Sequence, residues 1–221
     1  MIKDIDNNEY NIVEIGSQKW SSKNLMTTRF RNGDSIKNIS SIKEWEQAGK
    51  NGTPAWCFYN NNPENGKLFG LIYNWHAVID PRGLAPLNTH LPSIEEWREL
   101  KKFCSPNEGE KLKSKDTWEV ISCPNHPNRG KVAVGIDKFE FCALPGGYRD
   151  DTINRMNDKG EFFGLYETAH FWSSSKWDNK LNSFNPHGMG FGLNSGNTAS
   201  NTFHGEVGMG GSVRFIKDTI C

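Results

Sequence analysis

Aromatic, amide and imidazole side chains gather in residues 172–211, a stretch rich in Gly, Asn and Ser with few aliphatic residues. Rings supply apolar contact area, and amides both donate and accept hydrogen bonds, which together suit a sugar or a protein surface. We therefore predict that loops in this stretch bind a glycan or a protein ligand. The residues predicted to do so are Trp172, Trp177, Asn179, Asn182, Asn185, His187, Asn194, Asn197, Asn201 and His204.

Two further interpretations of the same stretch stay open. Gly, Asn and Ser are the residues of ordinary β-turns, so the stretch could be a series of turns that binds nothing. Long loops carry function more often than other segments, so the sequence favours the binding interpretation and the turn interpretation about equally. Asp178, Asn179 and backbone carbonyls could also supply the oxygen ligands that Ca²⁺ takes, and no other cofactor is predicted.

No arrangement of residues in the sequence points to catalysis. The run Ser173-Ser174-Ser175 lacks the flanking glycines of a hydrolase nucleophile turn. The six histidines show neither H-x-x-x-H nor H-E-x-x-H spacing, and no phosphate-binding loop occurs. The glycines of residues 188–192 resemble a dinucleotide fingerprint only loosely, because no helical pattern follows them. We therefore predict that the protein is not an enzyme and has no catalytic residue.

The five cysteines give no metal or redox motif. They are an odd number and contain no C-x-x-C pair, which argues against a zinc ribbon and against a thioredoxin-type site. An odd number also fits poorly with a complete disulfide framework, although one or two bridges stay open. We predict that most of them are small buried hydrophobic residues.

Charge and hydropathy exclude several partners. Lys and Arg number 26, as do Asp and Glu, so no overall field attracts nucleic acid or anionic lipid. No apolar run approaches the length of a membrane span, and the polar N-terminus does not read as a signal peptide. We expect a cytoplasmic protein if Met1 is the native start, and a secreted or surface protein if a leader was removed.

Two helices and several short strands should position these side chains. Ser41 and Ser93, each followed three residues later by Glu, predict capping boxes for helices that begin after them, the first ending near Gly49. Between Ile5 and Trp20, short apolar runs are interrupted by the turn residues Asn and Gly, which predicts paired strands. Residues 213–216 alternate between apolar and polar side chains and predict a last strand. Short strands, two helices and long loops indicate an α+β fold, and the absence of a linker indicates one domain over residues 1–221.

Six short motifs occur in one order along the chain and together are more specific than any alone. They are Trp20-Ser-Ser-Lys-Asn24-Leu25, Tyr73-Asn-Trp75-His-Ala77, His90-Leu-Pro92-Ser-Ile-Glu-Glu96-Trp97, Leu144-Pro-Gly-Gly-Tyr-Arg149, Phe171-Trp-Ser-Ser-Ser175 and Ser212-Val-Arg214-Phe-Ile-Lys-Asp218. The set resembles the Fibrobacter succinogenes major paralogous domain family over residues 4–218, and more distantly the formylglycine-generating-enzyme branch of C-type-lectin-like folds.

The resemblance implies a C-type-lectin-like mixed fold whose N- and C-terminal strands pair, in a family found mostly in secreted or surface-attached bacterial proteins. Some relatives in the wider fold are diversified ligand-binding proteins with variable residues in the C-terminal stretch. Members often carry Cys where this chain has Phe215, so a disulfide there is not expected.

Two alternatives to a recognition module follow from the same resemblance. One is an oxidoreductase like the formylglycine-generating enzymes, which need two thiols near the C-terminal strand because soft thiolates select Cu(I). After Cys142 the chain has only Cys221, so no such pair is present. The other is a structural or assembly domain without a small ligand.

Overall fold

The computed structural model describes residues 1–120, 130, 134–150, 161–177 and 187–219 of the 221-residue chain. The described helices are α1 (Ile42–Asn51), α2 (Pro63–Phe69), α3 (Trp75–Val78), α4 (Ile94–Cys104) and α5 (Glu108–Leu112), with a 3-10 turn at Tyr59–Asn61. The described strands are β1 (Ile2–Lys3), β2 (Glu9–Tyr10), β3 (Ile12–Ile15), β4 (Gln18–Ser21), β5 (Lys37–Asn38), β6 (Ala55–Cys57), β7 (Ile72–Asn74), β8 (Thr89–His90), β9 (Gly146–Arg149), β10 (Phe162–Leu165), β11 (Thr168–Trp177), β12 (His187–Asn194), β13 (Ser200–Glu206), β14 (Gly210–Gly211) and β15 (Ile216–Lys217).

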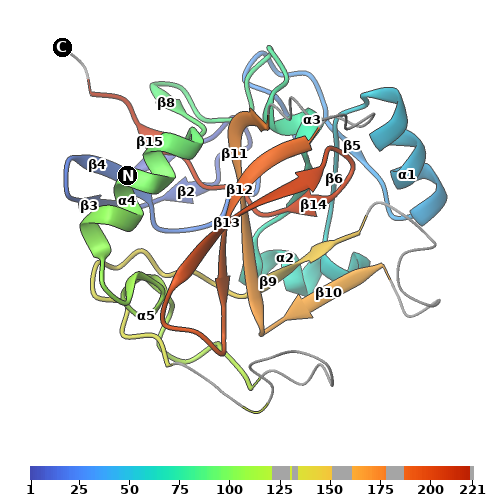
Figure 1. The fold of residues 1–221 in the computed structure, drawn as a ribbon. Helices are drawn as coiled ribbons and strands as arrows, with labels where there is room; N and C mark the ends of the chain where they lie inside the picture. The colour runs from blue at the N-terminus through green and yellow to red at the C-terminus, as the bar shows by residue number, and fades with distance from the viewer. Residues whose placement is uncertain (121–129, 131–133, 151–160, 178–186, 220–221) are drawn as a thin grey trace.

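The strands of the described residues form one large sheet and two small ones (Figure 1). The large sheet has the order β13-β12-β11-β9-β14-β7-β6-β5, with β10 paired to β9. A four-stranded sheet has the order β3-β4-β15-β8, and β1 pairs with β2. In the four-stranded sheet Ile216 lies opposite Trp20, so the N- and C-terminal strands pair, as the resemblance implied. Helices and several sheets together confirm the predicted α+β class.

The helix starts follow the predicted chemistry. At α4 the Ser93 hydroxyl accepts a hydrogen bond from the Glu96 N–H, and the Glu96 carboxylate accepts one from the Ser93 N–H, which completes the capping box. At α1 the Ser41 side chain accepts from Glu44. The predicted end of α1 at Gly49 is wrong, because the helix continues to Asn51 and ends on Gly52 in the left-handed conformation.

Gly49 has a packing role inside α1 instead. A Cβ built on Gly49 would lie 2.8 Å from the Cα of Gly208, so a larger residue would push the helix off the chain beneath it. The prediction of two helices is also too low, since three more were missed: α2, α3 and α5 have seven, four and five residues. Elements this short carry too little of the 3.6-residue period to be recognised from sequence.

The prediction of long loops through residues 172–211 is wrong for the residues that the structure describes there. Most of them form the C-terminal part of β11 and all of β12, β13 and β14. In β12 the apolar residues Met189, Phe191 and Leu193 recur with the period of two that a strand requires, and glycines occupy the alternate positions. Glycine-rich composition therefore hid a strand pattern.

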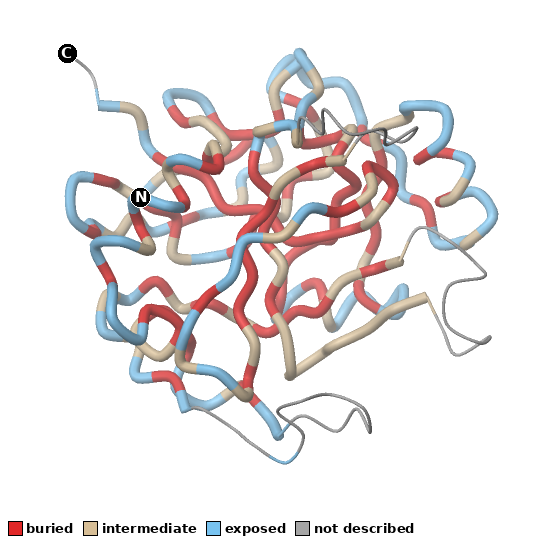
Figure 2. Tube along the Cα trace, viewed as in Figure 1, coloured by how far each residue is buried: buried red, intermediate tan, exposed pale blue. Residues whose placement is uncertain are grey.

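Buried stretches of chain run through the middle of the domain (Figure 2). Most of the largest fully buried side chains are rings of Trp, Tyr and Phe. Trp97 of α4 stacks on Phe191 with ring centroids 4.7 Å apart and planes 5° from parallel, and on Phe171 at 5.6 Å. Helix α4 thus covers one face of β11 and β12. Burial of one ring of this size stabilises the fold by about 2–3 kcal/mol. None of the described helices has the length and apolar character needed to cross a membrane.

Candidate functional site

Three of the predicted residues meet where β11, β12 and β13 come together at one end of the hairpin. Trp177 lies opposite His187 in the β11–β12 register, and His204 reaches them from β13. The indole of Trp177 stacks on the imidazole of His204, with centroids 4.0 Å apart and planes 1° from parallel. The ring of His187 stands edge-on to both at 5.5 Å. We call these three residues the Trp177 cluster.

The glycines of β12 allow other side chains to pack close against this strand. Gly188, Gly190 and Gly192 all face away from α4, and side chains from elsewhere occupy the space that a Cβ would need. A Cβ on Gly188 would lie 2.4 Å from the Trp75 ring, and one on Gly190 would lie 2.3 Å from the Phe203 ring. The strand therefore requires glycine for close packing rather than for a turn.

Trp177 differs from the other seven tryptophans of the chain. Each of those seven is buried and donates its indole N–H to an acceptor within the protein. Trp20, for example, donates to Gln18 Oε1, and Trp172 donates to the Tyr73 carbonyl. Trp177 is partly exposed and donates no hydrogen bond to any described residue. Buried indoles usually have a hydrogen-bond acceptor for the N–H. A partly exposed indole whose N–H has no acceptor in the protein can donate that hydrogen bond to a ligand.

The other predicted residues do not join the cluster. Trp172 lies in the hydrophobic core, 1% exposed, where its N–H bonds to the Tyr73 carbonyl at 3.0 Å, so including it in the site was wrong. Asn194 and Asn197 lie at the opposite end of the β12–β13 hairpin, where their side chains accept hydrogen bonds from Gly196 and Ala199 within the turn. Asn201 is exposed on β13.

The remaining predictions fall outside the described residues. Asn179, Asn182 and Asn185 lie there, and so does Asp178 of the calcium hypothesis. Within the described residues no three His, Cys, Asp or Glu side chains are grouped so as to hold a metal ion. Cys57 and Cys104 are buried free thiols, as predicted for small hydrophobic residues, and Cys142 is a partly exposed one.

A charged triad that the sequence did not reveal joins β8, α4 and the C-terminal segment. His90 Nε2 lies 2.7 Å from Glu96 Oε1, and its Nδ1 lies 2.6 Å from Asp218 Oδ1. The hydrogen bond to Glu96 raises the pKa of His90 to about 9 against the opposing effect of burial, and Asp218 adds to the rise. Burial raises the pKa of Glu96, but hydrogen bonds from His90 and Ser93 outweigh it and hold this pKa at about 2.

The triad is a structural clamp rather than a general base. Each imidazole nitrogen is hydrogen-bonded to a carboxylate, so His90 has no free lone pair with which to accept a proton from a substrate. Asp218 lies 128 positions from His90, and nothing local in the sequence pairs them. Only the pairing of β15 with β8 brings them together.

A known protein family matches this sequence over most of its length. The model described as the Fibrobacter succinogenes major domain matches residues 13–217, nearly the full length. The chain belongs to the Fibrobacter succinogenes major domain family. No curated protein and no solved structure matches it.

Two arginines in the motifs that carried the family resemblance are buried structural residues. Arg214 donates to Asn24 Oδ1 and to the carbonyls of Ser21, Phe141 and Cys142, at 2.6–2.8 Å. Its guanidinium also lies 4.6 Å from the Phe141 ring centroid. Burial lowers the pKa of Arg214 to about 10, which leaves it charged at neutral pH.

Arg149, on β9 of the large sheet, also ties separate segments together. It donates to the carbonyls of Ile39 and Ser40 and to Glu161, and its guanidinium lies 4.4 Å from the ring centroid of Trp45. In this member of the family the arginines of the Gly-Gly-Tyr-Arg and Ser-Val-Arg motifs therefore tie distant segments of the chain together.

Proposed function

We propose that this domain is a non-catalytic recognition module that binds a glycan or protein ligand at the Trp177 cluster. The observation that carries the proposal is the state of Trp177: partly exposed, stacked on one side by His204, and with an indole N–H that no described residue uses. We further propose a C-type-lectin-like arrangement, on the basis of the family resemblance and the paired terminal strands, and a secreted or surface location.

The chemistry of the cluster suits recognition. An indole offers a large rigid contact area and one donor at low entropic cost, and imidazoles offer both donors and acceptors. The strands hold all three rings in place before a ligand arrives, so less conformational freedom is lost on binding. None of the three residues of the cluster is a Ser, Thr or Cys that a hydrolytic mechanism could use as its nucleophile.

The test is binding by the double variant Trp177→Ala, His204→Ala. Labelled wild-type domain is applied to a glycan array and to immobilised bacterial surface proteins, and the variant is compared on every surface that wild type binds. Loss of binding with an unchanged unfolding midpoint supports the proposal. Phe103→Ala serves as the control, because Phe103 is 53% exposed and lies on α4 away from the cluster.

Two outcomes would overturn the proposal. The first is full binding by the double variant on every surface that wild type recognises. The second is wild-type protein that binds no surface and self-associates in light scattering, which would support the assembly alternative.

A further inference from the structure

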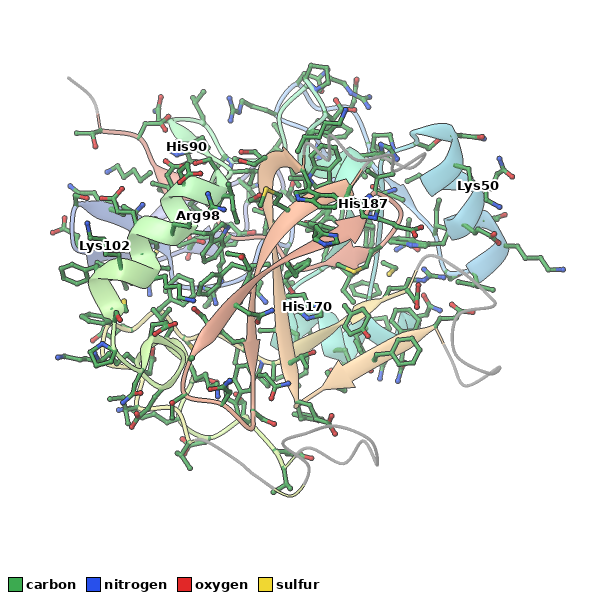
Figure 3. The ribbon with its side chains drawn as sticks, in the orientation of Figure 1. Lys50, His90, Arg98, Lys102, His170 and His187 are labelled. Atoms are coloured by element: carbon green, nitrogen blue, oxygen red, sulfur yellow. The ribbon has the colours of Figure 1, made fainter. Side chains whose placement is uncertain are left out.

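A second set of rings crosses the large sheet on the other face of β12. Phe163 of β10, Tyr148 of β9, His170 of β11 and Phe203 of β13 follow one another with ring centroids 5.6, 4.6 and 4.7 Å apart. All four are partly exposed. We call them the His170 row, and Figure 3 labels both His170 of this row and His187 of the Trp177 cluster.

Strand alternation separates this row from the Trp177 cluster. His170 lies opposite Gly192 and Phe203 lies opposite Gly190, whereas Trp177 lies opposite His187 and His204 lies opposite Met189. Even- and odd-numbered residues of β12 point to opposite faces of the sheet. The two sets of rings can therefore be altered independently.

His170 is the unusual member of the row. It lies on a central strand of the sheet, where a polar side chain normally has a hydrogen-bond partner. Its Nδ1 is buried without a partner, and the imidazole makes no side-chain hydrogen bond to any described residue. Burial lowers the pKa of His170 to about 4, so the ring is neutral at physiological pH.

The ring spacing indicates what could join the row. Centroid separations of 4.6–4.7 Å are too short for rings tiled edge to edge, so these rings pack with overlapping faces at tilts of 35–39°. Their faces are occupied by one another, and a sugar would find no flat platform to stack on. A further aromatic ring continues such a packing through its own edge or face.

We propose that the His170 row binds a small uncharged ligand that consists of an aromatic ring bearing a hydroxyl group, and that this hydroxyl hydrogen-bonds to Nε2 of His170, because Nδ1 is shut off from solvent. The partly exposed rings supply apolar contact, and Nε2 of the neutral imidazole supplies one donor or one acceptor, which a hydroxyl can match in either case. A carboxylate gains nothing from a neutral imidazole that it would not gain from water. The proposal does not depend on the function assigned to the Trp177 cluster.

Two probes that differ by one hydroxyl test the proposal. N-acetyl-tyrosinamide and N-acetyl-phenylalaninamide are titrated into ¹⁵N-histidine-labelled protein, and shifts of the His170 imidazole signals are followed by NMR. We expect the tyrosine amide to shift these signals and to bind roughly fivefold more tightly, the contribution of one net hydrogen bond. Methyl pyranosides are titrated in parallel.

The variant His170→Phe keeps a ring at this position and removes both nitrogens. We expect it to bind the two amides equally and to keep its unfolding midpoint, whereas the control His204→Phe keeps the preference for the tyrosine amide. The inference is overturned if neither amide shifts the His170 signals, if His170→Phe retains the preference, or if only the pyranosides bind the row. None of these outcomes bears on whether the Trp177 cluster binds its ligand.

Discussion

Trp177 and His204 come from strands that are not neighbours in the sheet, yet their rings are stacked within 1° of parallel at 4.0 Å. The strand between them, β12, contributes His187, whose ring stands edge-on to both. One face of the indole is thereby fixed against the protein. A ligand would meet a side chain whose orientation is already set, which reduces the entropic cost of binding.

The eight tryptophans should divide sharply in their effect on stability. We expect Trp172→Ala to lower the free energy of unfolding by about 3–5 kcal/mol, because it opens a cavity in the core and leaves the Tyr73 carbonyl without its donor. Trp177→Ala should cost about 1 kcal/mol or less, since this ring is partly exposed and unbonded. Urea denaturation measures both, and equal losses would contradict the assignment of Trp177 to a binding surface.

The clamp at His90 predicts a stability that depends on pH. The pKa of His90 is raised to about 9 in the folded protein from about 6.5 in the unfolded chain. Its contribution is therefore complete below about pH 6.5 and disappears as the pH rises through about 9. We expect His90→Gln to lower the free energy of unfolding by about 1 kcal/mol at pH 6, a value discounted because the side chain is 41% exposed, and to have little effect at pH 10.

Denaturation of wild type and His90→Gln at pH 6, 8 and 10 checks this expectation. The difference between them should shrink at each step. A constant difference across the range would mean that His90 stabilises the fold by packing alone, without its charge.

The close packing against β12 predicts unequal costs for substitutions at two glycines that alternate along the strand, Gly190 and Gly192. A Cβ on Gly190 would lie 2.3 Å from the Phe203 ring and 2.7 Å from the Phe171 carbonyl, which is backbone and cannot move aside. A Cβ on Gly192 would meet only the end of the Asn201 side chain, at 2.6 Å. We expect Gly190→Ala to cost about 2 kcal/mol and Gly192→Ala less than about 1 kcal/mol in urea denaturation. The reverse order would contradict the packing described.

The geometry of Arg214 predicts that lysine cannot replace it. The planar guanidinium donates in four directions at once, and an ammonium would leave several of these buried acceptors unpaired. We expect Arg214→Lys to lower the free energy of unfolding by about 3–5 kcal/mol. Arg98→Lys is the matched control, because Arg98 pairs with Glu95 on the surface of α4 and should change stability by under about 0.5 kcal/mol.

How far the fold could be predicted depended on whether each signal was local. The start of α4 could be predicted because the capping box lies within four residues. The strand β12 could not, because its glycines are explained by Trp75 and Phe203, more than ten positions away on either side. Composition favoured turns there, and only the alternation of Met189, Phe191 and Leu193 indicated a strand.

The candidate site shows the same division. The residue types of Trp177, His187 and His204 could be recognised as suited to a ligand, but their convergence required the strand register. Trp172 was wrongly included because its type is the same as that of Trp177 and only its depth differs. The sequence did not indicate a role for His170, because its unusual feature is a buried Nδ1 without a hydrogen-bond partner, which only the structure reveals.

The unequal surroundings of the tryptophans also give the protein an intrinsic optical reporter. Seven indoles are shielded and bonded, so they should emit at short wavelength and resist quenching by acrylamide. Trp177 should supply the red-shifted, readily quenched part of the emission. The difference spectrum between wild type and Trp177→Phe therefore isolates one residue, and any molecule that reaches the Trp177 cluster can be followed by light without a label.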